Sequence, residues 1–260
     1  MHLAIDVGNT ESVIGLFQPD SLDVEAHWRY ATPVPRSSDE LLLLFRGFLR
    51  DAGRDMEELT RIVVGSVVPA HAEILRRTLA GVSEGQVHFL EGADRLPIRL
   101  EVEEPRTVGA DRIANTLAAH HLYREDTVVV DLGTATTFDC IGGEGTFVGG
   151  VIAPGIQAGQ EWLGERTAKL PSVEFSPPDR VIGRRTESCL RSGLFYSAVD
   201  AIDGIVGRIL SEWERPKARV VATGGYAGLV APHSRTVRHL EPHLTLVGLT
   251  LAGRYLDGGA

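Results

Sequence analysis

One short pattern occurs twice in the chain, and this duplication constrains the fold more than any other feature of the sequence. Each copy is an apolar strand, an aspartate, a tight turn of small residues and a second strand. The copies are built around Asp6-Val-Gly-Asn-Thr and Asp131-Leu-Gly-Thr-Ala-Thr-Thr, and apolar runs at residues 2–5 and 127–130 precede them. Such a run before a turn is typical of a buried strand. Since each copy opens one half of the chain, the sequence predicts one fold used twice.

The residue types in these two hairpins suit a metal-bound phosphate chain. A carboxylate at the mouth of a turn holds a cation, and backbone N–H groups and hydroxyls in the turn meet phosphate oxygens. A single Asp-x-Gly is also typical of an ordinary β-turn. Two copies in equivalent places favour the phosphate site. Two facing hairpins would hold a nucleotide triphosphate in a cleft between the halves of the chain.

The remaining periodicity predicts an α/β succession with an antiparallel start. Ser38 is the expected cap of the first helix, and the strongly apolar strand at 61–68 is expected to be central in its sheet. The halves are expected to meet near residues 115–125. The predicted elements of the first half are three strands within 2–31, helix 38–49, strand 61–68, a helix from Pro69, strand 87–90 and helix 113–123. Those of the second half are strands 127–130, 136–141 and 146–152, helices 155–163 and 186–213, strand 219–222 and helix 246–256.

Composition excludes several classes of protein. With 260 residues the chain is long enough for one large domain or two smaller ones. Its formal charge of −9 argues against a nucleic-acid surface, which would be basic. Cys140 and Cys189 are the only cysteines, so a disulfide framework is not expected and a reducing compartment fits. No basic leader or membrane-length apolar run is present, and we expect a cytoplasmic protein without a membrane partner.

Known catalytic motifs of other classes are missing. The sequence contains no Gly-x-x-x-x-Gly-Lys-Ser/Thr, no protein-kinase signature and no Gly-x-Ser-x-Gly. The nine histidines include no His-Glu-x-x-His, so a zinc enzyme is not expected. The pair His120-His121 is expected on the surface or edge of its helix.

The stretch Gly109-Ala-Asp-Arg has two interpretations. It could simply begin a helix, because an acid in the first turn offsets the helix dipole. Alternatively, Asp111 takes the proton of a substrate hydroxyl as that hydroxyl attacks phosphorus. A helix amino terminus favours the ionised carboxylate and makes it less basic, but phosphoryl transfer depends mainly on positioning and charge compensation. An aspartate that orients the nucleophile is therefore sufficient.

Two sets of glycines also have alternative uses. Thr223-Gly-Gly could be an ordinary turn from a strand to a helix, or a surface on which a base or ribose lies against backbone. Gly193, Gly204 and Gly207 weaken the long predicted helix at 186–213. We expect them to allow another helix to approach closely, either within the subunit or across a dimer.

Together these motifs resemble type III pantothenate kinase. The motifs that carry the resemblance occur in the family's order over nearly the whole chain. They are Asp6-Val-Gly-Asn-Thr, Gly109-Ala-Asp-Arg followed by Asn115, Asp131-Leu-Gly-Thr-Ala-Thr-Thr, Gly149-Gly-Val-Ile-Ala-Pro-Gly, Thr167-Ala-Lys-Leu-Pro and Ile202-Asp-Gly-Ile-Val. The resemblance implies two ribonuclease-H-like domains of the actin-like ATPase superfamily, placed at residues 1–118 and 119–260, with an interdomain ATP cleft. It also implies ATP-dependent phosphorylation of pantothenate at its terminal hydroxyl, the first step of coenzyme A synthesis.

The resemblance further implies a homodimer, Mg²⁺ and activation by a monovalent cation, K⁺ or NH₄⁺. Asp111 would accept the proton, Asp6 would lie near the magnesium, and Asp131 would bind the monovalent cation. Thr186 would contact pantothenate, although it also suits a simple helix cap. The implied ATP-binding residues are Asp6, Val7, Gly8, Asn9, Thr10, Glu11, Ser12, Val13 and Thr134, and the implied pantothenate pocket is lined by Gly109, Ala110, Asp111 and Arg112.

The sequence departs from the family pattern at three places. Glu104 stands where relatives often carry asparagine, Val102 lies near a common tyrosine, and Ser197 replaces a common glycine. These changes concern substrate contacts and leave the reaction class intact. Two other functions remain open: a regulatory protein that binds ATP with little turnover, and a superfamily kinase for a sugar or short acid. The intact Asp6, Asp111 and Asp131 argue against the first, and the short chain argues against the second.

Overall fold

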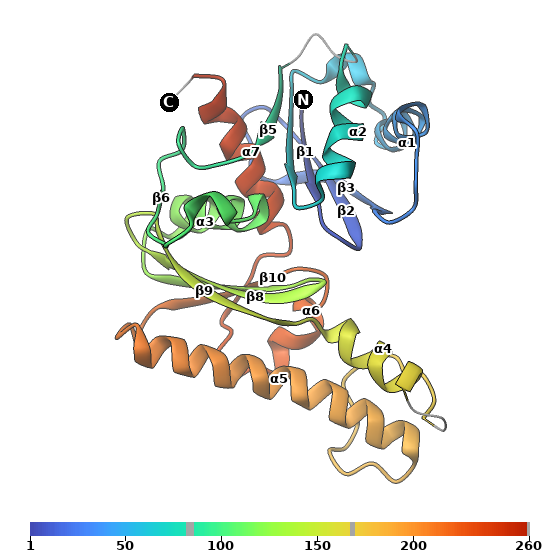
Figure 1. Cartoon of the computed structure of the whole chain (residues 1–260), viewed down its shortest axis with the longest axis vertical. Coiled ribbons are helices and arrows are strands. Elements are labelled where there is room, and N and C mark those ends of the chain that lie inside the picture. The colour runs from blue at the N-terminus through green and yellow to red at the C-terminus, as the bar shows by residue number, and fades with distance from the viewer. Residues whose placement is uncertain (82–85, 167–169, 259–260) are drawn as a thin grey trace. The chain divides into compact units, whose positions relative to one another are not determined.

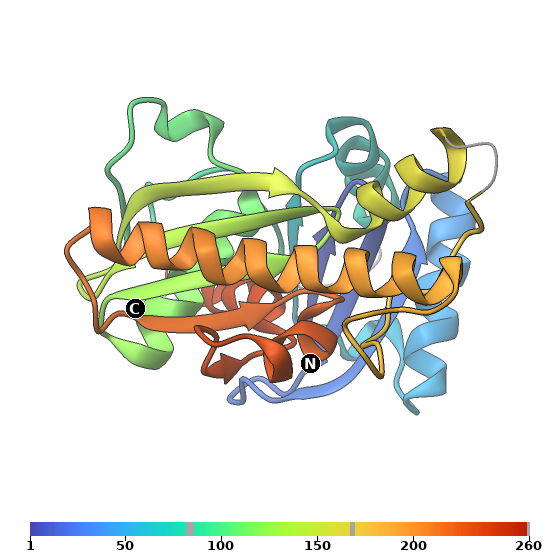
Figure 2. The same ribbon diagram turned by 90° about the horizontal axis from the view of Figure 1, so that it is seen from below.

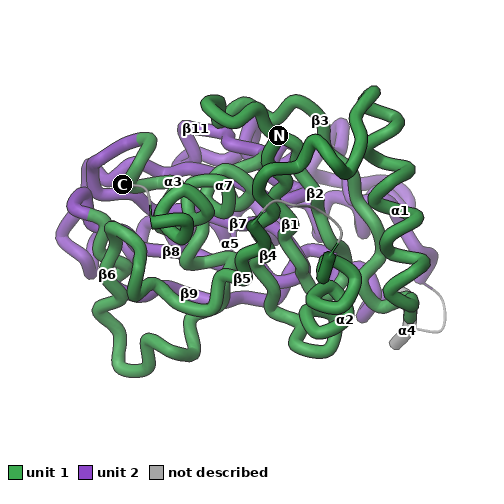
Figure 3. The backbone as a smooth tube through the Cα atoms, turned by 90° about the horizontal axis from the view of Figure 1, so that it is seen from above, with its two compact units in different colours: residues 1–122, 145–147, 243–260 green, residues 123–144, 148–242 purple. Residues whose placement is uncertain are grey.

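The computed structural model describes residues 1–81, 86–166 and 170–258, and the chain forms two compact units (Figure 3). Unit 1 consists of residues 1–122, 145–147 and 243–260, and unit 2 of residues 123–144 and 148–242. The division follows packing rather than chain order. The C-terminal segment, which the sequence analysis placed in the second domain, belongs to unit 1. The division into domains at residues 1–118 and 119–260 stays a prediction.

A five-stranded sheet with the order β3-β2-β1-β4-β5 forms the centre of unit 1 (Figure 1). The first three strands are antiparallel, and β4 and β5 then add in parallel. The strands are β1 (His2–Val7), β2 (Glu11–Phe17), β3 (Val24–Ala31), β4 (Arg61–Ser66) and β5 (Gln86–Leu90). The strand predicted to be central, β4, is an interior strand that pairs with β1 and β5, and β1 is the middle strand of the five. An apolar run indicates a strand that is buried on both faces, and this property does not distinguish one interior strand from another.

Two helix pairs cover the two faces of this sheet. Helices α1 (Ser38–Asp51) and α2 (Pro69–Leu79) bury apolar side chains in one core with Leu3, Ile5 and Val7 of β1. Helices α3 (Ala110–Tyr123) and α7 (Leu244–Leu256) form a second core with Ala4 and Val63. Because side chains alternate along a strand, Asp6 points to the same face of β1 as Ala4, which is the face of α3 and α7.

Two helix starts in unit 1 differ from their predictions. The cap of α1 is Ser37, not Ser38: Ser37 Oγ accepts from the backbone N–H of Glu40, and the Glu40 carboxylate accepts from the backbone N–H of Ser37. This reciprocal pair satisfies two N–H groups, which Ser38 without a facing acid cannot do. Helix α3 begins at Ala110 rather than Ile113, so that Asp111 lies within its first turn.

Unit 2 contains the second hairpin in a sheet with the order β11-β10-β7-β8-β9-β6. Strand β6 (Arg99–Leu100) pairs with Thr146 and Phe147, which belong to unit 1. Sequence reasoning missed the short elements β6, β11 and α6. The other strands of this sheet are β7 (Thr127–Leu132), β8 (Ala135–Gly142), β9 (Thr146–Pro154), β10 (Arg219–Thr223) and β11 (His239–Leu240). The helices of unit 2 are α4 (Ile156–Arg166), α5 (Thr186–Glu212) and α6 (Ala227–Val230). Three 3-10 turns lie at Met56–Glu58, Pro105–Thr107 and Ala231–His233.

The long helix α5 covers one face of the unit 2 sheet, where it is the orange helix of Figure 2. Its buried apolar side chains are Phe195, Val199, Ile202 and Val206. Of the predicted apolar face, Leu190, Leu194, Ala198, Ile205 and Ile209 are only half-buried, so the helix is rotated toward Phe195 and Val199. The other side of α5 is open: a Cβ built on Gly193, Gly204 or Gly207 meets no described atom within 4 Å. Close approach of a helix from the same subunit is therefore not seen in the described part of the chain.

Candidate functional site

The first hairpin is a tight turn between β1 and β2. The backbone N–H of Gly8 donates to the carbonyl of Glu11 over 3.1 Å, and Asp6 pairs with Val13 across the strands. A Cβ on Gly8 would lie 3.0 Å from the Glu11 oxygen, so a larger residue would push the turn open. The backbone N–H of Thr32, the residue after β3, donates to the Thr10 carbonyl over 3.0 Å. The turn is thus held from both sides.

The residues predicted to bind ATP in this hairpin differ in accessibility. Asn9 and Glu11 are exposed, while Asp6, Gly8, Thr10 and Val13 are half-buried. Val7 and Ser12 are fully buried, and the Ser12 hydroxyl hydrogen-bonds the hydroxyl of Thr32 at 2.9 Å. Ser12 and Val7 can therefore offer a ligand only backbone groups, and the side chains that reach solvent come from the other positions.

Asp111 lies at the same end of unit 1 as this hairpin. Asp6 is in register with Gly65 of β4, and a Cβ on Gly65 would lie 3.5 Å from the Cβ of Ala110. The backbone N–H of Val67 donates to the Val7 carbonyl over 3.1 Å. Asp6 and the first turn of α3 therefore share one face and one end of the sheet. Two carboxylates that lie 105 residues apart in sequence are brought to one place by the register of β1 and β4.

The start of α3 is built for a carboxylate that folds back on the chain. Asp111 Oδ1 accepts from the backbone N–H of Arg112 over 2.8 Å. A Cβ on Gly109 would lie 2.4 Å from that oxygen and 3.2 Å from the Val67 side chain, so a larger residue there would displace the Asp111 carboxylate. The guanidinium of Arg112 lies 4.9 Å from the centre of the Phe147 ring. Gly109, Asp111 and Arg112 are half-buried, and Ala110 is buried.

Three glycine-bearing turns meet at the second hairpin in unit 2. Its own turn closes when the N–H of Gly133 donates to the Ala135 carbonyl over 3.1 Å. A Cβ on Gly155 would lie 2.1 Å from the Thr134 carbonyl oxygen. Gly224 has a φ of +89°, and a Cβ there would lie 2.5 Å from Asp131 Oδ1. The Thr223-Gly-Gly turn therefore packs directly on the Asp131 carboxylate, and it is more than a generic link from strand to helix.

For two further predicted features, the structure contradicts one interpretation or describes only part of the motif. Thr186 is exposed and is the first residue of α5, but the capping residue is Arg185. Its N–H and that of Arg184 donate to Ser188 Oγ, so the interpretation of Thr186 as a helix cap was wrong. In the motif Thr167-Ala-Lys-Leu-Pro, residues 167–169 lie outside the described residues.

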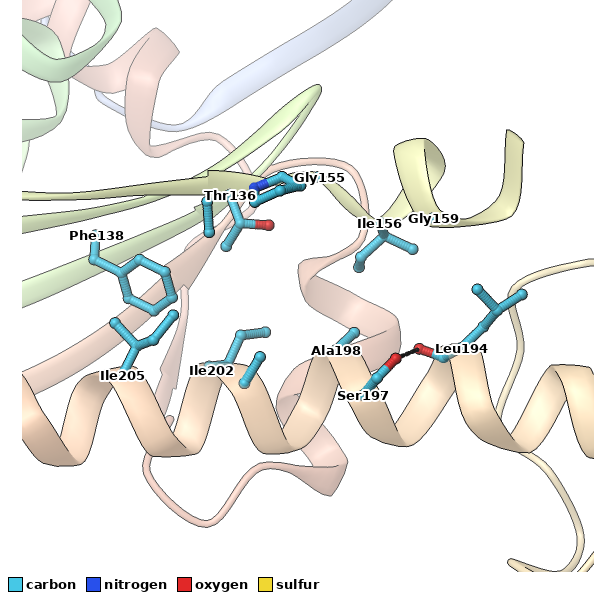
Figure 4. A pocket seen from close by; sticks show the side chains of 13 residues that line it. Thr136, Phe138, Gly155, Ile156, Gly159, Leu194, Ser197, Ala198, Ile202 and Ile205 are labelled. Atoms are coloured by element: carbon cyan, nitrogen blue, oxygen red, sulfur yellow. Dashed lines mark hydrogen bonds between the residues drawn. The ribbon is translucent and has the colours of Figure 1, made fainter. Parts of the chain in front are cut away.

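A pocket of about 160 Å³ opens in unit 2 beside the second hairpin, between β8, β9, α4 and α5 (Figure 4). Its lining includes Thr136, Phe138, Ile156 and Ile202, with no charged side chain among the lining residues. Ser197, one of the departures from the family pattern, also lines it, and its hydroxyl donates to the Leu194 carbonyl over 3.1 Å. The apolar lining suits a hydrocarbon group rather than a phosphate.

The donor set fits a cation that is shared with phosphate. Among the described residues, no cluster of three His, Cys, Asp or Glu side chains is arranged to hold a metal alone. Mg²⁺ in phosphoryl-transfer sites is usually held by one or two carboxylates together with substrate phosphates, so a single aspartate per hairpin is sufficient. No helix in the described part of the chain is long and apolar enough to cross a membrane.

Comparison with known proteins identifies the family. The family model described as type III pantothenate kinase matches residues 2–208. The chain belongs to this family. Type III pantothenate kinases of Frankia alni and Moorella thermoacetica are 43% identical over 252 residues and 40% identical over 251 residues, and each alignment covers 96% of this chain and 98% of the relative. Members of the family are kinases that phosphorylate pantothenate in coenzyme A biosynthesis.

Solved structures of low sequence identity share the fold. The ROK hexokinase of Thermus thermophilus aligns with a TM-score of 0.53 at 14% identity, covering 98% of this chain and 99% of its own. The activator of 2-hydroxyisocaproyl-CoA dehydratase from Clostridium difficile, solved with bound ADPNP, aligns with a TM-score of 0.53 at 11% identity, covering 99% and 96%. The predicted α/β fold of two ribonuclease-H-like domains is confirmed.

Proposed function

We propose that this chain transfers the γ-phosphoryl group of ATP to the terminal hydroxyl of pantothenate and forms 4'-phosphopantothenate. The observation that carries the proposal is family membership over nearly the full length of the chain. The site supports it, because Asp6 and Asp111 lie at one end of one sheet face in unit 1. That the nucleotide lies in an interdomain cleft stays a prediction from the sequence.

Each of the two hairpins would bind a different part of the nucleotide and its cations. Backbone N–H groups between Asp6 and Val13 would meet phosphate oxygens, and Asp6 would lie near Mg²⁺, which neutralises phosphate charge when bound. Thr134, which is exposed, would contact ATP from the second hairpin. Asp131 would hold the monovalent cation, K⁺ or NH₄⁺. The contact between Gly224 and the Asp131 carboxylate supports this role, since it fixes the direction in which that carboxylate points.

Asp111 would accept the proton of the pantothenate hydroxyl while Gly109 to Arg112 and Thr186 hold the substrate. The second carboxylate oxygen of Asp111, Oδ2, would accept this proton, since Oδ1 already accepts a hydrogen bond from the Arg112 N–H. That bond fixes the side chain, and a fixed acceptor orients the attacking hydroxyl. Because phosphoryl transfer gains most from positioning and charge compensation, an ordinary carboxylate in this place is sufficient.

We further propose a homodimer that uses the open side of α5. Small residues Gly193, Gly204 and Gly207 leave that side flat, with no described atom near their Cβ positions. Ile152 of β9 and Trp162 of α4, which also belong to unit 2, are 66% and 61% exposed. A flat helix face and exposed apolar side chains in the same unit suit a second copy of the chain. Sedimentation of the purified protein tests the assembly.

Mass spectrometry of the reaction products tests the activity. The purified chain is incubated with ATP, Mg²⁺ and pantothenate in either K⁺ or Na⁺ buffer. We expect 4'-phosphopantothenate in K⁺ and much less in Na⁺. Equal rates in the two buffers would remove the monovalent cation from the mechanism, and no product in either buffer or with NH₄⁺ would contradict the proposed reaction.

The variant Asp111→Asn tests the role of the carboxylate. We expect it to fold and to lose at least about a hundredfold in kcat, the usual size of a general-base effect. Asp39→Asn is the matched control, because Asp39 is an exposed acid in the first turn of α1. Each variant removes an acid from the first turn of a helix, but only the first should lose turnover. Full activity of Asp111→Asn would remove Asp111 from the chemistry.

A further inference from the structure

Four polar side chains form a buried chain of hydrogen bonds behind the first hairpin. Thr32 Oγ1 and Ser12 Oγ lie 2.9 Å apart, and Tyr30 Oη and His71 Nε2 lie 2.8 Å apart. Ser12 and Tyr30 are in register on β2 and β3, so their side chains are neighbours on one face of the sheet and the two pairs adjoin. Burial raises the pKa of the Tyr30 hydroxyl, and a hydrogen bond from Ser12 acts to lower it. The exposed fractions of Thr32, Ser12, Tyr30 and His71 are 6%, 0%, 6% and 5%. The chain of bonds is therefore shielded from water along its length.

The chain connects the phosphate turn to two other elements. Ser12 follows the turn directly, and it is in register with Val7 on β1 and with Tyr30 on β3. His71 lies in the first turn of α2, and its backbone N–H donates to the Val68 carbonyl over 3.1 Å. Ser12 points to the same face as Ile14 and Leu16 in the α1–α2 core. The network therefore lies on the sheet face opposite to Asp6 and Asp111.

An apolar core would hold these strands together equally well, so the polar chain requires another explanation. Buried hydroxyls cost free energy unless each one is paired, and a fully paired network fixes one arrangement. Burial lowers the pKa of His71, which keeps the imidazole neutral at neutral pH. In the tautomer with the proton on Nδ1, Nε2 accepts from Tyr30, Tyr30 accepts from Ser12 and Ser12 accepts from Thr32. All the bonds then run in one direction.

We propose that Tyr30 and His71 are positioning residues for the nucleotide. They hold the Ser12 side chain, and through it they fix the turn at residues 8–11 so that its backbone N–H groups converge on the phosphates. A second attachment acts on the same turn, since the Thr32 N–H donates to the Thr10 carbonyl over 3.0 Å. The inference rests on the proposed role of this hairpin in binding ATP.

Steady-state kinetics of four variants test the proposal. Tyr30→Phe removes the central hydroxyl and His71→Leu removes the terminal acceptor. We expect each to raise KM for ATP about tenfold, and to leave KM for pantothenate within twofold. His71→Gln should restore KM for ATP to within about threefold of the natural protein, because its amide oxygen can take the place of Nε2.

Thr78→Val is the matched control. Thr78 is 3% exposed on the same helix as His71, but its hydroxyl donates only to the Ile74 carbonyl of its own helix. It should change thermal stability without changing KM for ATP. If Tyr30→Phe behaves like Thr78→Val, with lower stability and unchanged KM for ATP, the network is merely structural and the proposal is overturned. Equal rises in both KM values would also overturn it.

Calorimetric binding of ADP with Mg²⁺ separates this inference from the proposed function. If the natural protein binds ADP but forms no phosphopantothenate, the proposed reaction fails, while weaker ADP binding by Tyr30→Phe still supports the network. If the natural protein is active and Tyr30→Phe binds ADP with unchanged affinity, the network proposal fails alone. If the natural protein binds no nucleotide, both are wrong.

Discussion

Asp203 is a buried carboxylate on α5 that holds the loop at residues 234–236, and replacing it with asparagine should loosen that loop. Its side chain is 3% exposed. Oδ1 accepts from Ser234 Oγ over 2.6 Å and from Thr236 Oγ1 over 2.8 Å, and also from the Thr236 N–H over 3.1 Å. Oδ2 accepts from the backbone N–H and from Nε of Arg235, over 2.9 and 3.1 Å. In Asp203→Asn an NH₂ group would replace one oxygen and face donors.

The size of the effect follows from the pKa of this carboxyl. Burial acts to raise the pKa of Asp203, but hydrogen bonds from Ser234, Arg235 and Thr236 outweigh burial and lower it from 3.8 to about 2. One pKa unit corresponds to about 1.4 kcal/mol, so the folded loop favours the ionised form by roughly 2 kcal/mol. Little of this comes from the Arg235 side chain, because that side chain is 80% exposed.

Amide hydrogen exchange measures the free energy of opening this loop, and it does not require the two units of the chain to unfold in one two-state transition. In Asp203→Asn the amides of Arg235 and Thr236 should exchange about thirtyfold faster, since roughly 2 kcal/mol corresponds to that factor. Asp200→Asn is the control: Asp200 lies one turn earlier, is 71% exposed and is 3.9 Å from Arg235, so it should leave exchange unchanged.

The pH dependence gives a second check on the same carboxylate. Because the folded pKa is lowered, its stabilisation is fully present above the ordinary value near 3.8 and is lost as the pH falls toward about 2. The difference between the natural protein and Asp203→Asn should therefore be constant at neutral pH and shrink between pH 4 and 2. Equal protection of the loop in both proteins at pH 7 would refute the reasoning.

Two further predictions concern helix α7 in unit 1. Asp257→Asn should lower the free energy of unfolding at neutral pH by about 1 kcal/mol. Burial acts to raise the pKa of Asp257, but hydrogen bonds from Arg61 and His88 outweigh burial and lower it, so the loss of stability should fade in acid. Denaturation at pH 7 and pH 3 measures this loss, and a loss of equal size at both pH values would contradict the prediction. Gly248→Ala should lower the free energy of unfolding by about 3 kcal/mol or more, because the new Cβ would lie 2.0 Å from a backbone oxygen of α3. Gly47→Ala is the control: Gly47 lies in open space on α1, so alanine there should raise the free energy of unfolding by about 0.5 kcal/mol. Melting temperatures that move the same way in both glycine variants would contradict the second prediction.

The sequence by itself determined the local elements and the hairpins that define the fold. An apolar run followed by an aspartate and a glycine turn predicts strand, turn and strand, and β1, β2, β7 and β8 lie where this pattern put them. Periodicity also located β3 and the start of α2 at Pro69. These features depend on neighbours within a few residues, so a linear pattern contains all the information they require.

The tertiary structure decided what depends on distant partners. Only the register of β1 with β4 brings Asp6 and Asp111 to one end of a sheet. Ser12 was predicted to serve a ligand, yet its hydroxyl points into the core, where it meets the hydroxyl of Thr32 beside Tyr30 of the neighbouring strand. Helix α7 joins unit 1 because Gly248 lets it pack against the backbone of α3. Such pairings are set by shape and hydrogen bonding between segments that are far apart in the chain, and no local pattern encodes them.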